Sequence, residues 1–319
     1  NGDSILIISP TKQTVLIDAG DAGKGKVIAD ALKRYNVQQI DYFIATHPHP
    51  DHIGGADEVL KATKVLRVID NGQEPDVPES LIAQPKAPAK GKKPAPAARS
   101  KTASVTKFFD EYKEALTQSG AQYEKSEVGR KYDIGGGARL TILAPSEPFF
   151  TKEQMKSGGN EPNANSIVLR LDYGDFSMLL MGDAEEQTEE RLVQKETNLG
   201  ATVLKVAHHG SKYATAKDFV GRVRPEVAII SCGEWNRYGH PSQVVLDNLK
   251  NSNVKVYRTD LQGEISITTR GRENDYVVKT SKEAATDIFT GRTAQKDDST
   301  RSGFIAYGDF GPPPKQKGK

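Results

Sequence analysis

The chain has 319 residues, enough for one large domain or two ordinary ones with a substantial core. Its 44 Lys and Arg residues and 42 Asp and Glu residues give a formal net charge of +2, so no field of the whole molecule attracts nucleic acid or an anionic membrane. The one cysteine, Cys232, excludes an intramolecular disulfide and a thiolate cluster, so a metal site would have to use His, Asp or Glu.

The beginning of the chain leaves its location open. No apolar run approaches the roughly 20 residues that span a bilayer, and the first residues lack the basic-then-apolar layout of a signal peptide. The chain starts without methionine at Asn1, directly before a strand-like segment, which looks like a processed end. Export to the periplasm or the medium with the signal removed is therefore one expectation, and a cytoplasmic location is the other.

The first predicted elements alternate between strand and helix. Two short β-branched runs, 4–10 and 14–20, are separated by a turn-prone segment, which predicts an antiparallel pair of strands. The periodicity then predicts, in order, a helix at 25–37, a strand at 40–46, a helix at 56–63 and a strand at 64–70.

Residues 84–103 have a composition unlike that of the segments around them. They include five lysines, one arginine and four prolines, with no acidic and no large apolar side chain. Such a segment cannot pack into a core, so we expect a disordered insertion. In the simpler interpretation it is a solvated loop. In the other, its basic part, 86–101, holds DNA or another anionic polymer, because clustered Lys and Arg release counterions from phosphates.

The rest of the chain repeats the mixture of helices and strands. Helices are predicted at 105–120, 184–196, 216–223 and 242–251, and strands at 138–145, 165–174, 176–183, 202–210, 226–233, 254–260 and 263–270. Two such halves predict an α/β protein in which two sheets pack face to face with helices outside, a four-layer αβ/βα sandwich. We expect one domain over 1–280, followed by an extension, 281–319, with a polar, proline-rich tail.

All the histidines lie in three short segments, each directly after a predicted strand or in a connecting loop. The segments THPHPDH, VAHHGS and RYGHPS hold His47, His49, His52, His208, His209 and His240. A lone loop histidine is more often a surface residue than a ligand. Clustering on loops reverses that expectation, because loops on a rigid scaffold carry functional groups.

The first histidine segment has the stereochemistry of a metal-binding loop. In an extended chain, residues two apart project to the same side, so His47 and His49 can grip one cation. Pro48 and Pro50 are expected to hold that extension by restricting φ. Glycines 54 and 55 let the backbone pass closely before the next helix.

Asp51 and His52 then turn toward a second position, so the spacing suggests two ions. Imidazoles and a carboxylate suit zinc, with manganese or iron as competitors. A pair of ions about 3.5 to 4 Å apart needs an anionic bridge. Asp183, which Gly182 releases into a turn after a predicted strand, can supply it; the alternative is that Asp183 only caps the following helix.

These residues resemble the metallo-β-lactamase superfamily, whose HxHxDH signature matches His47, His49, Asp51 and His52. More narrowly, seven segments in order look like the hydrolase domain of the ComEC competence channel and its free-standing relatives. They are GDSILI, VLIDAG, THPHPDHIGG, NANSIVLRLDYGDFSMLLMGDAE, LKVAHHGS, NRYGHPS and VYRTDLQGEI. The resemblance runs from residue 2 to about residue 267, leaving out the lysine-proline insertion and the C-terminal segment.

The resemblance implies a metallo-β-lactamase-like fold and a hydrolase with two divalent ions, zinc above all. It implies that the first ion is held by His47 and His49, the second by Asp51 and His52, and that the bridge is Asp183. Many members of the superfamily have a further histidine between the HxHxDH loop and the bridging aspartate, whereas residues 53–207 of this chain contain none.

The missing ligand therefore comes from elsewhere, and we assign it to the AHHGS pair, favouring His208 over His209. His240 then completes the second ion. In an opposing assignment Asp260 is that last ligand, and His240 donates a proton to the leaving group.

Two more residues are assigned to the surroundings of the ions. Asn165 lines the site by analogy with the family. Asp18, at the end of the second predicted strand, orients a ligating histidine from behind. The simpler alternative for Asp18 is a turn residue before Gly20. Trp235 and Tyr238 either wall the substrate pocket or only pack.

The implied chemistry is hydrolysis. Two divalent ions lower the pKa of a shared water, supply a bridging hydroxide and stabilise charge on the attacked centre, while Asp51 or Asp183 takes the remaining proton. The ComEC resemblance and the basic insertion favour a phosphodiesterase that cuts nucleic acid. The alternative is a hydrolase of small esters, lactones, β-lactams or cell-wall phosphoesters. A binding module without chemistry is disfavoured, because HxHxDH and Asp183 are intact.

Overall fold

The structure is a computed structural model, and it describes residues 2–75, 99–155, 160–234, 236 and 238–292. The predicted insertion lies outside these residues up to position 98, and so does the tail beyond 292. Among the described helices, none combines the length and the apolar character needed to cross a bilayer.

The first sheet follows the chain order. It contains β1 (Ile5–Ile8), β2 (Thr14–Ile17), β3 (Gln39–Ile44), β4 (Lys64–Asp70) and β5 (Gln122–Lys125). β1 and β2 are antiparallel, as the sequence predicts, and the later neighbours are parallel. β5 was not predicted, because its sequence, QYEK, is mostly polar and exposed on a sheet edge.

The second sheet has the order β12-β11-β10-β9-β8-β7-β6. Its strands are β6 (Lys131–Asp133), β7 (Ala138–Ala144), β8 (Val168–Tyr173), β9 (Phe176–Leu180), β10 (Val203–Lys205), β11 (Val227–Ile230) and β12 (Lys255–Arg258). The strands β6 to β9 pair antiparallel, and β9 to β12 pair parallel. A separate hairpin, β13 (Ile265–Thr269) and β14 (Tyr276–Thr280), packs its Ile267 and Tyr276 on the core between the large sheets.

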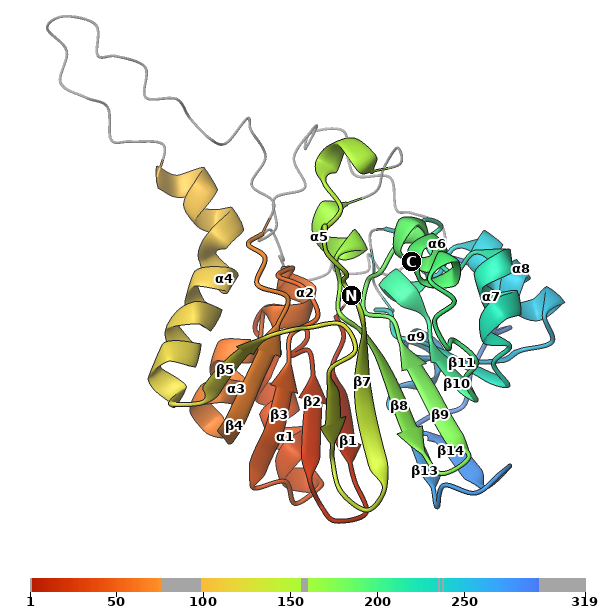
Figure 1. Cartoon of the computed structure of the whole chain (residues 1–319), viewed down its shortest axis with the longest axis horizontal. Helices are drawn as coiled ribbons and strands as arrows, with labels where there is room; N and C mark the ends of the chain where they lie inside the picture. The colour runs from red at the N-terminus through yellow and green to blue at the C-terminus, as the bar shows by residue number, and fades with distance from the viewer. Residues whose placement is uncertain (1, 76–98, 156–159, 235, 237, 293–319) are drawn as a thin grey trace, which may run out of the picture.

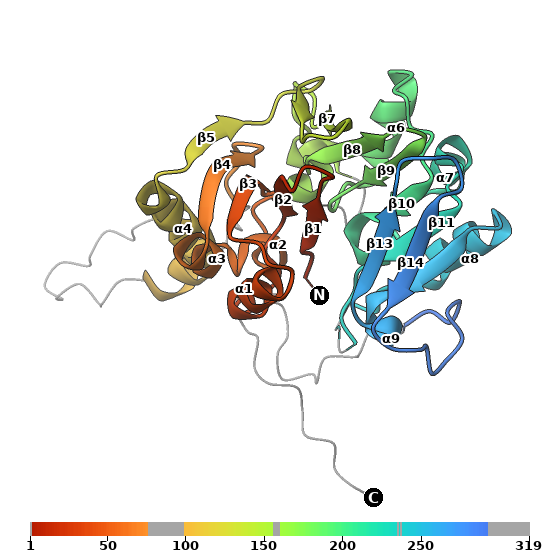
Figure 2. The same cartoon turned by 90° about the horizontal axis from the view of Figure 1, so that it is seen from below.

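Helices cover the outer face of each large sheet (Figure 1 and Figure 2). On the first sheet these are α1 (Gly25–Arg34), α3 (Ala56–Ala62) and α4 (Arg99–Ser119), and on the second α6 (Glu186–Gln194), α7 (Lys217–Val223) and α8 (Gln243–Asn251). Shorter elements lie in the connections: α2 (Pro50–Ile53), η2 (Lys152–Gln154), α5 (Glu161–Ala164), η3 (Ala207–Gly210) and α9 (Thr259–Gln262).

The burial pattern explains the layers. In β2, Val15 and Ile17 point into the core between the two sheets, while Leu16 points into the core under the helices. In β10, Val203 and Leu204 divide in the same way between the inner core and the core under α6 to α8. Because strands bury both faces in this manner, the four-layer αβ/βα sandwich is confirmed.

Two predicted boundaries differ from the structure. Helix α4 begins at Arg99, so the last residues of the segment predicted to be disordered are helical. That part of the segment contains no proline, and its Arg, Lys and Ala residues favour helix. Downstream, Arg258 donates to the carbonyl oxygens of Ile288 and Thr290, so residues 288–290 are attached to β12. The domain boundary at residue 280 stays a prediction.

Candidate metal centre

The candidate residues follow strand ends that meet at one edge of the two sheets (Figure 1). The HxHxDH loop follows β3, Asp183 follows β9, and the two adjacent histidines follow β10. Because β9 and β10 are parallel, their carboxyl ends lie side by side. The site is thus shared between the two sheets.

The HxHxDH loop is extended only in its first part. His49 has φ −77° and ψ 146°, and its Nδ1 lies 3.0 Å from His47 Nε2, so both rings face one place. His49 is extended directly before Pro50, as expected, and Pro50 itself is the first residue of helix α2. Proline suits that position, where an N–H has no partner within the helix. The helical turn is what redirects Asp51 and His52.

The two glycines after this loop allow a close approach, as expected. A Cβ at Gly54 would lie 2.2 Å from the Pro50 carbonyl oxygen and 2.4 Å from the Ala22 nitrogen. A Cβ at Gly55 would lie 2.5 Å from the Ala19 carbonyl oxygen. Any larger residue would push the histidine loop off the turn that follows β2.

Asp183 lies at the centre of the site and does not cap a helix. The N-cap of α6 is Glu185, and Gly182, with φ +53°, turns the chain so that Asp183 points inward. The Asp183 carboxylate faces four imidazole rings. Its shortest oxygen–nitrogen distances are to His52 (3.2 Å), His209 (3.5 Å), His47 (3.9 Å) and His208 (3.9 Å).

The two adjacent histidines are held in an uncommon backbone conformation. His208 and His209 both have left-handed backbone angles, with φ 46° and 54°. Consecutive residues of this kind are strained, and such strain persists where surrounding structure imposes it, often at functional sites. The turn brings both rings to the site: His209 Nε2 lies 3.2 Å from Asp51 Oδ2, and His208 Nε2 lies 3.2 Å from the Asn163 side-chain nitrogen.

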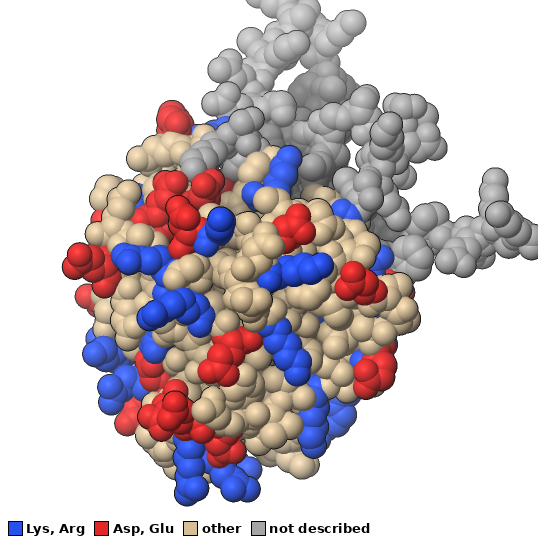
Figure 3. All heavy atoms as spheres, turned by 90° about the vertical axis from the view of Figure 1, so that its right-hand side faces the viewer, with Lys and Arg blue, Asp and Glu red and all other residues tan. Residues whose placement is uncertain are grey.

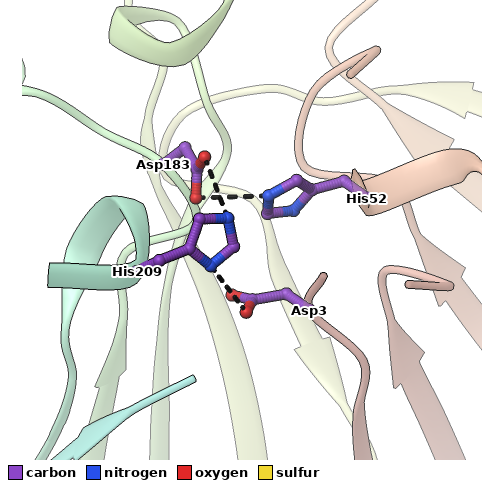
Figure 4. A group of neighbouring side chains, drawn as sticks. All are labelled: Asp3, His52, Asp183 and His209. Atoms are coloured by element: carbon purple, nitrogen blue, oxygen red, sulfur yellow. Dashed lines mark ion pairs between the residues drawn. The ribbon is translucent and has the colours of Figure 1, made fainter. Parts of the chain in front are cut away.

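Two carboxylates lie behind the imidazoles. Asp18 Oδ2 lies 2.7 Å from His52 Nδ1, and the same carboxylate accepts from the backbone N–H and the hydroxyl of Thr46. On the other side, Asp3 Oδ1 lies 3.3 Å from His209 Nδ1 (Figure 4). Asp18 is predicted there from the sequence, whereas Asp3 is not, because its only distinctive feature is its position just before the first strand.

His240 lies beside the cluster rather than among the carboxylates. Its ring is 6.4 Å from the His209 ring and 5.6 Å from the His208 ring, and Tyr238 stacks on it at 5.7 Å. Within the part of the chain that the structure describes, His240 forms no ion pair with a carboxylate. Asn236 fixes its backbone by accepting from the His240 N–H and donating to the His240 carbonyl. Trp235 lies outside the described residues.

Two predicted site residues have other partners. The Asn165 side chain forms two hydrogen bonds with the backbone of Phe150, so it clamps a loop, and the amide that reaches the histidines is that of Asn163. Asp260 binds the guanidinium groups of Arg258 and Arg292 through both of its oxygens. A carboxylate held in this way is a poor candidate for a metal ligand.

The charges of the site are strongly coupled. Burial alone would lower the pKa of His52 and of His209, but the Asp183 carboxylate, helped by Asp18 and Asp3 respectively, raises both, to about 10 for His209. Burial would raise the pKa of Asp51 and Asp183, but His209 and His52 hold both below their usual range. Protons and cations therefore compete for these two imidazoles, and metal binding favours their neutral form.

The residues fit a divalent metal. His52 Nε2 and Asp183 Oδ1 are buried without a hydrogen-bond partner among the described residues, although they face each other. Buried polar atoms are rarely left in this state unless something else binds them. Imidazole nitrogens and carboxylate oxygens are ligands of zinc and of similar transition ions.

Comparison with known proteins agrees with this site. Residues 1–121 match the sequence model of the metallo-beta-lactamase superfamily. The fold and the site agree with this match, and the chain resembles the metal-dependent hydrolases of that superfamily.

Two relatives give a narrower comparison within the superfamily. ComE operon protein 3 of Bacillus subtilis is 30% identical over 295 residues, which cover 87% of this chain and 33% of that protein. Recombination protein 2 of Haemophilus influenzae is 26% identical over 271 residues, covering 83% of this chain and 27% of that protein. The chain is therefore similar to proteins of the ComEC type, and it spans about a third or less of the length of these relatives.

Solved structures with a similar fold include one metallo hydrolase of about the same extent as this chain. Igni18, a metallo hydrolase from Ignicoccus hospitalis, is 15% identical with a TM-score of 0.42, covering 80% of this chain and 90% of that one. A similarity at this level adds nothing to the assignment.

Proposed function

We propose that the chain is a two-metal phosphodiesterase that acts on nucleic acid. The observation that carries the proposal is the position of Asp183 among imidazoles: its Oδ1 lies 3.2 Å from His52, and its Oδ2 lies 3.5 to 3.9 Å from His209, His47 and His208. One carboxylate between two nitrogen-rich pockets has the form of a bridging ligand.

The ligands divide into two sets that share Asp183. The first position consists of His47, His49 and His208, and the second of Asp51, His52 and His209. This assignment gives both histidines of the AHHGS pair a ligand role. It replaces His240 in the second position with His209, because His209 Nε2 lies next to Asp51 Oδ2, whereas His240 has only ring contacts.

When bound, two divalent cations supply a water of lowered pKa and neutralise charge on the attacked phosphate. The side chains do the remaining work. Asp51, partly accessible at the edge of the site, can take up the proton released on attack, with Asp183 as the other acceptor. Burial lowers the pKa of His240 to about 3, so its imidazole is neutral and can donate an N–H hydrogen bond to the leaving group, whose proton comes from water.

The substrate class is argued from the relatives and from charge. The names of two relatives, Recombination protein 2 of Haemophilus influenzae and Competence protein ComA of Neisseria gonorrhoeae, refer to recombination and competence, which are processes of DNA. The face seen in Figure 3 has Lys, Arg, Asp and Glu interspersed, so that face offers no track of positive charge. A nucleic acid would therefore be held at the metal edge, with help from the basic segment 86–101, most of which lies outside the described residues.

The test is a metal analysis combined with a substrate panel on the purified chain. We expect two equivalents of zinc or manganese, and hydrolysis of bis(p-nitrophenyl) phosphate and plasmid DNA that stops with a chelator and returns with metal. A lactone and nitrocefin serve as the comparison substrates. Faster hydrolysis of either would contradict the proposal in favour of small-molecule chemistry.

A further inference from the structure

The two proposed metal positions share Asp183 and both contain imidazoles, but the groups around those imidazoles differ. The difference lies in the groups that bind the far nitrogen of each imidazole. Such partners set the orientation of a ligating ring and its strength as a donor.

The second position is surrounded by carboxylates. Asp51 belongs to it directly, since its Oδ2 lies 3.2 Å from His209 Nε2. Asp18 lies 2.7 Å from the far nitrogen of His52, and Asp3 lies 3.3 Å from the far nitrogen of His209. The side chains of Asp3, Asp18 and His209 are almost entirely buried, so water screens these charges little.

The first position has neutral groups in the corresponding places. His47 Nδ1 lies 3.1 Å from the Thr46 hydroxyl, and the far nitrogen of His208, Nδ1, lies 3.5 Å from the side-chain nitrogen of Asn163, which is 3.2 Å from Nε2. The nearest carboxylate to the His208 ring, Glu185, is 3.7 Å from Nδ1, and its oxygens accept from the Asn160 N–H. Within the part of the chain that the structure describes, Glu185 is thus the nearest carboxylate to His208 apart from Asp183 at 3.9 Å, and it lies beyond hydrogen-bond distance.

Asp3 belongs to the same buried group of possible ligands as His52, Asp183 and His209, but it lies behind His209. Its carboxylate faces His209 Nδ1, on the opposite side of the ring from Nε2, which faces Asp51 and Asp183 (Figure 4). The same Nδ1 lies 2.9 Å from the Ser231 carbonyl, so its proton points away from the metal side. The Asp3 carboxylate and the Ser231 carbonyl thus hold the proton on Nδ1, which leaves the lone pair of Nε2 free for a cation.

A buried lysine holds Asp3 in place. Lys205 Nζ lies 2.7 Å from Asp3 Oδ2, and the side chains of both residues are 2% exposed. Lys205 also donates to the Val206 carbonyl, and the Asp3 backbone N–H donates to the Asp51 carbonyl. Asp3 is therefore tied both to β10 and to the HxHxDH loop.

We propose that the two metal positions are unequal, that the Asp51–His52–His209 position binds its cation first and more tightly, and that Asp3 is a positioning residue for it. The proposal rests on the two-metal site of the proposed function. Its physical reason is the negative charge of Asp51 and Asp18, which remains at the second position even though Lys205 pairs with Asp3, and which attracts a divalent cation more strongly than three imidazoles do.

The test is a calorimetric titration of the metal-free full chain with Zn²⁺. We expect two binding steps of different affinity. Asp3→Asn should weaken the tighter step by about 10- to 100-fold and leave the weaker step within about 2-fold. Asn163→Ala should do the opposite. It should weaken only the low-affinity step, which we assign to the His47–His49–His208 position, because Asn163 lies beside His208.

A matched control separates this effect from a general loss of buried charge. Asp70 is also buried, and it accepts from the hydroxyls of Tyr112 and Tyr123 instead of facing an imidazole. Asp70→Asn should therefore lower stability and leave both Zn²⁺ affinities unchanged.

A double variant addresses the lysine that Asp3→Asn leaves without its partner. Asp3→Asn with Lys205→Met removes both charges and should keep the loss in the tighter step. Recovery of wild-type affinity in the double variant would overturn the proposal, and so would two equal steps in the wild type. Unequal steps without phosphodiesterase activity would contradict the proposed function and leave this inference standing. A chain that binds a single equivalent would contradict both.

Discussion

Asp183 and Asp260 show how one local pattern can have two outcomes. Each follows a strand of the parallel half of the second sheet, each is buried, and each has a pKa below its usual range. Asp183 faces four imidazoles, whereas Asp260 faces the guanidinium groups of Arg258 and Arg292. An imidazole can exchange its proton for a metal, but a guanidinium is always charged.

The comparison teaches that the partner decides the role of a buried carboxylate. Burial opposes ionisation of both aspartates, and it is His209 and His52 in one case and Arg258 in the other that outweigh it. A cation can compete for Asp183 because its partners are titratable. The partners of Asp260 are permanent, so that residue acts as a structural clamp.

The largest effect is expected from Asp183→Asn. An amide cannot bridge two cations, so bound metal should fall below two equivalents and phosphodiesterase activity should drop by more than about 100-fold. Elemental analysis and initial rates measure the two effects. Two retained equivalents with near wild-type activity would remove Asp183 from the centre of the site.

Asp260→Asn should affect stability instead. The change leaves the buried Arg258 without its ionic partner, and breaking a buried pair costs about 3 kcal/mol or more of the free energy of unfolding. Denaturant unfolding measures this loss, and bound metal should stay at two equivalents. A loss of metal without a loss of stability would show that Asp260 is a ligand after all.

The chain contains a matched control for this variant. Arg170 and Asp172 form a pair with the same spacing as Arg258 and Asp260, but the Asp172 side chain is 42% exposed. Because solvent screens an exposed pair, Asp172→Asn should cost less than about 1 kcal/mol.

Glu189 extends the comparison to a carboxylate without a cationic partner. Burial raises its pKa to about 8, although the backbone N–H groups of Thr215 and Ala216 donate to it, and Glu186 and Glu190 add to the rise. The folded chain therefore keeps this proton up to about pH 8, while the unfolded chain loses it near the ordinary value of 4.5. The native state binds more protons between these values, so stability should fall as pH rises through the window.

Glu189→Gln measures that dependence, because glutamine does not titrate. The slope of the free energy of unfolding against pH should become flatter by as much as about 1.4 kcal/mol per pH unit within the window. Unfolding curves of both proteins between pH 5 and pH 8 at fixed salt give the slopes. Parallel slopes would mean that Glu189 is ionised in the folded chain.

The smallest effects should separate two neighbouring asparagines. Asn165→Ala removes two hydrogen bonds to the Phe150 backbone and should cost about 1 to 3 kcal/mol of stability, with metal affinity unchanged. Asn163→Ala should cost less stability, and its effect should appear in the metal titration. The opposite pattern would restore the assignment of Asn165 to the site.

Much of the fold and the heart of the site follow from local patterns. The β-branched runs and the helical spacings predict the layers, because one face of each element must be buried. The HxHxDH segment can be interpreted without a structure, since its ligands lie within six residues. Asp183 was also within reach, because a glycine and an aspartate directly after an apolar strand place a carboxylate at a sheet edge.

Other parts of the site depend on contacts between distant segments. Asp3 and His209 are more than two hundred positions apart, and nothing in the residues around Asp3 indicates its partner. His208 and His209 carry the same side chain, so only the turn between them decides which pocket each one enters. For Asp260, the role of the carboxylate is determined by Arg258 and Arg292, which pack against it.

The sequence alone therefore determined the class of fold, the metal-binding character and the residues of the HxHxDH loop, because these depend on periodicity and on neighbours along the chain. Only the tertiary structure decided which carboxylates face imidazoles and which face guanidinium groups. The reason is that a buried charge takes its role from the group packed against it, and here that group comes from another strand or loop.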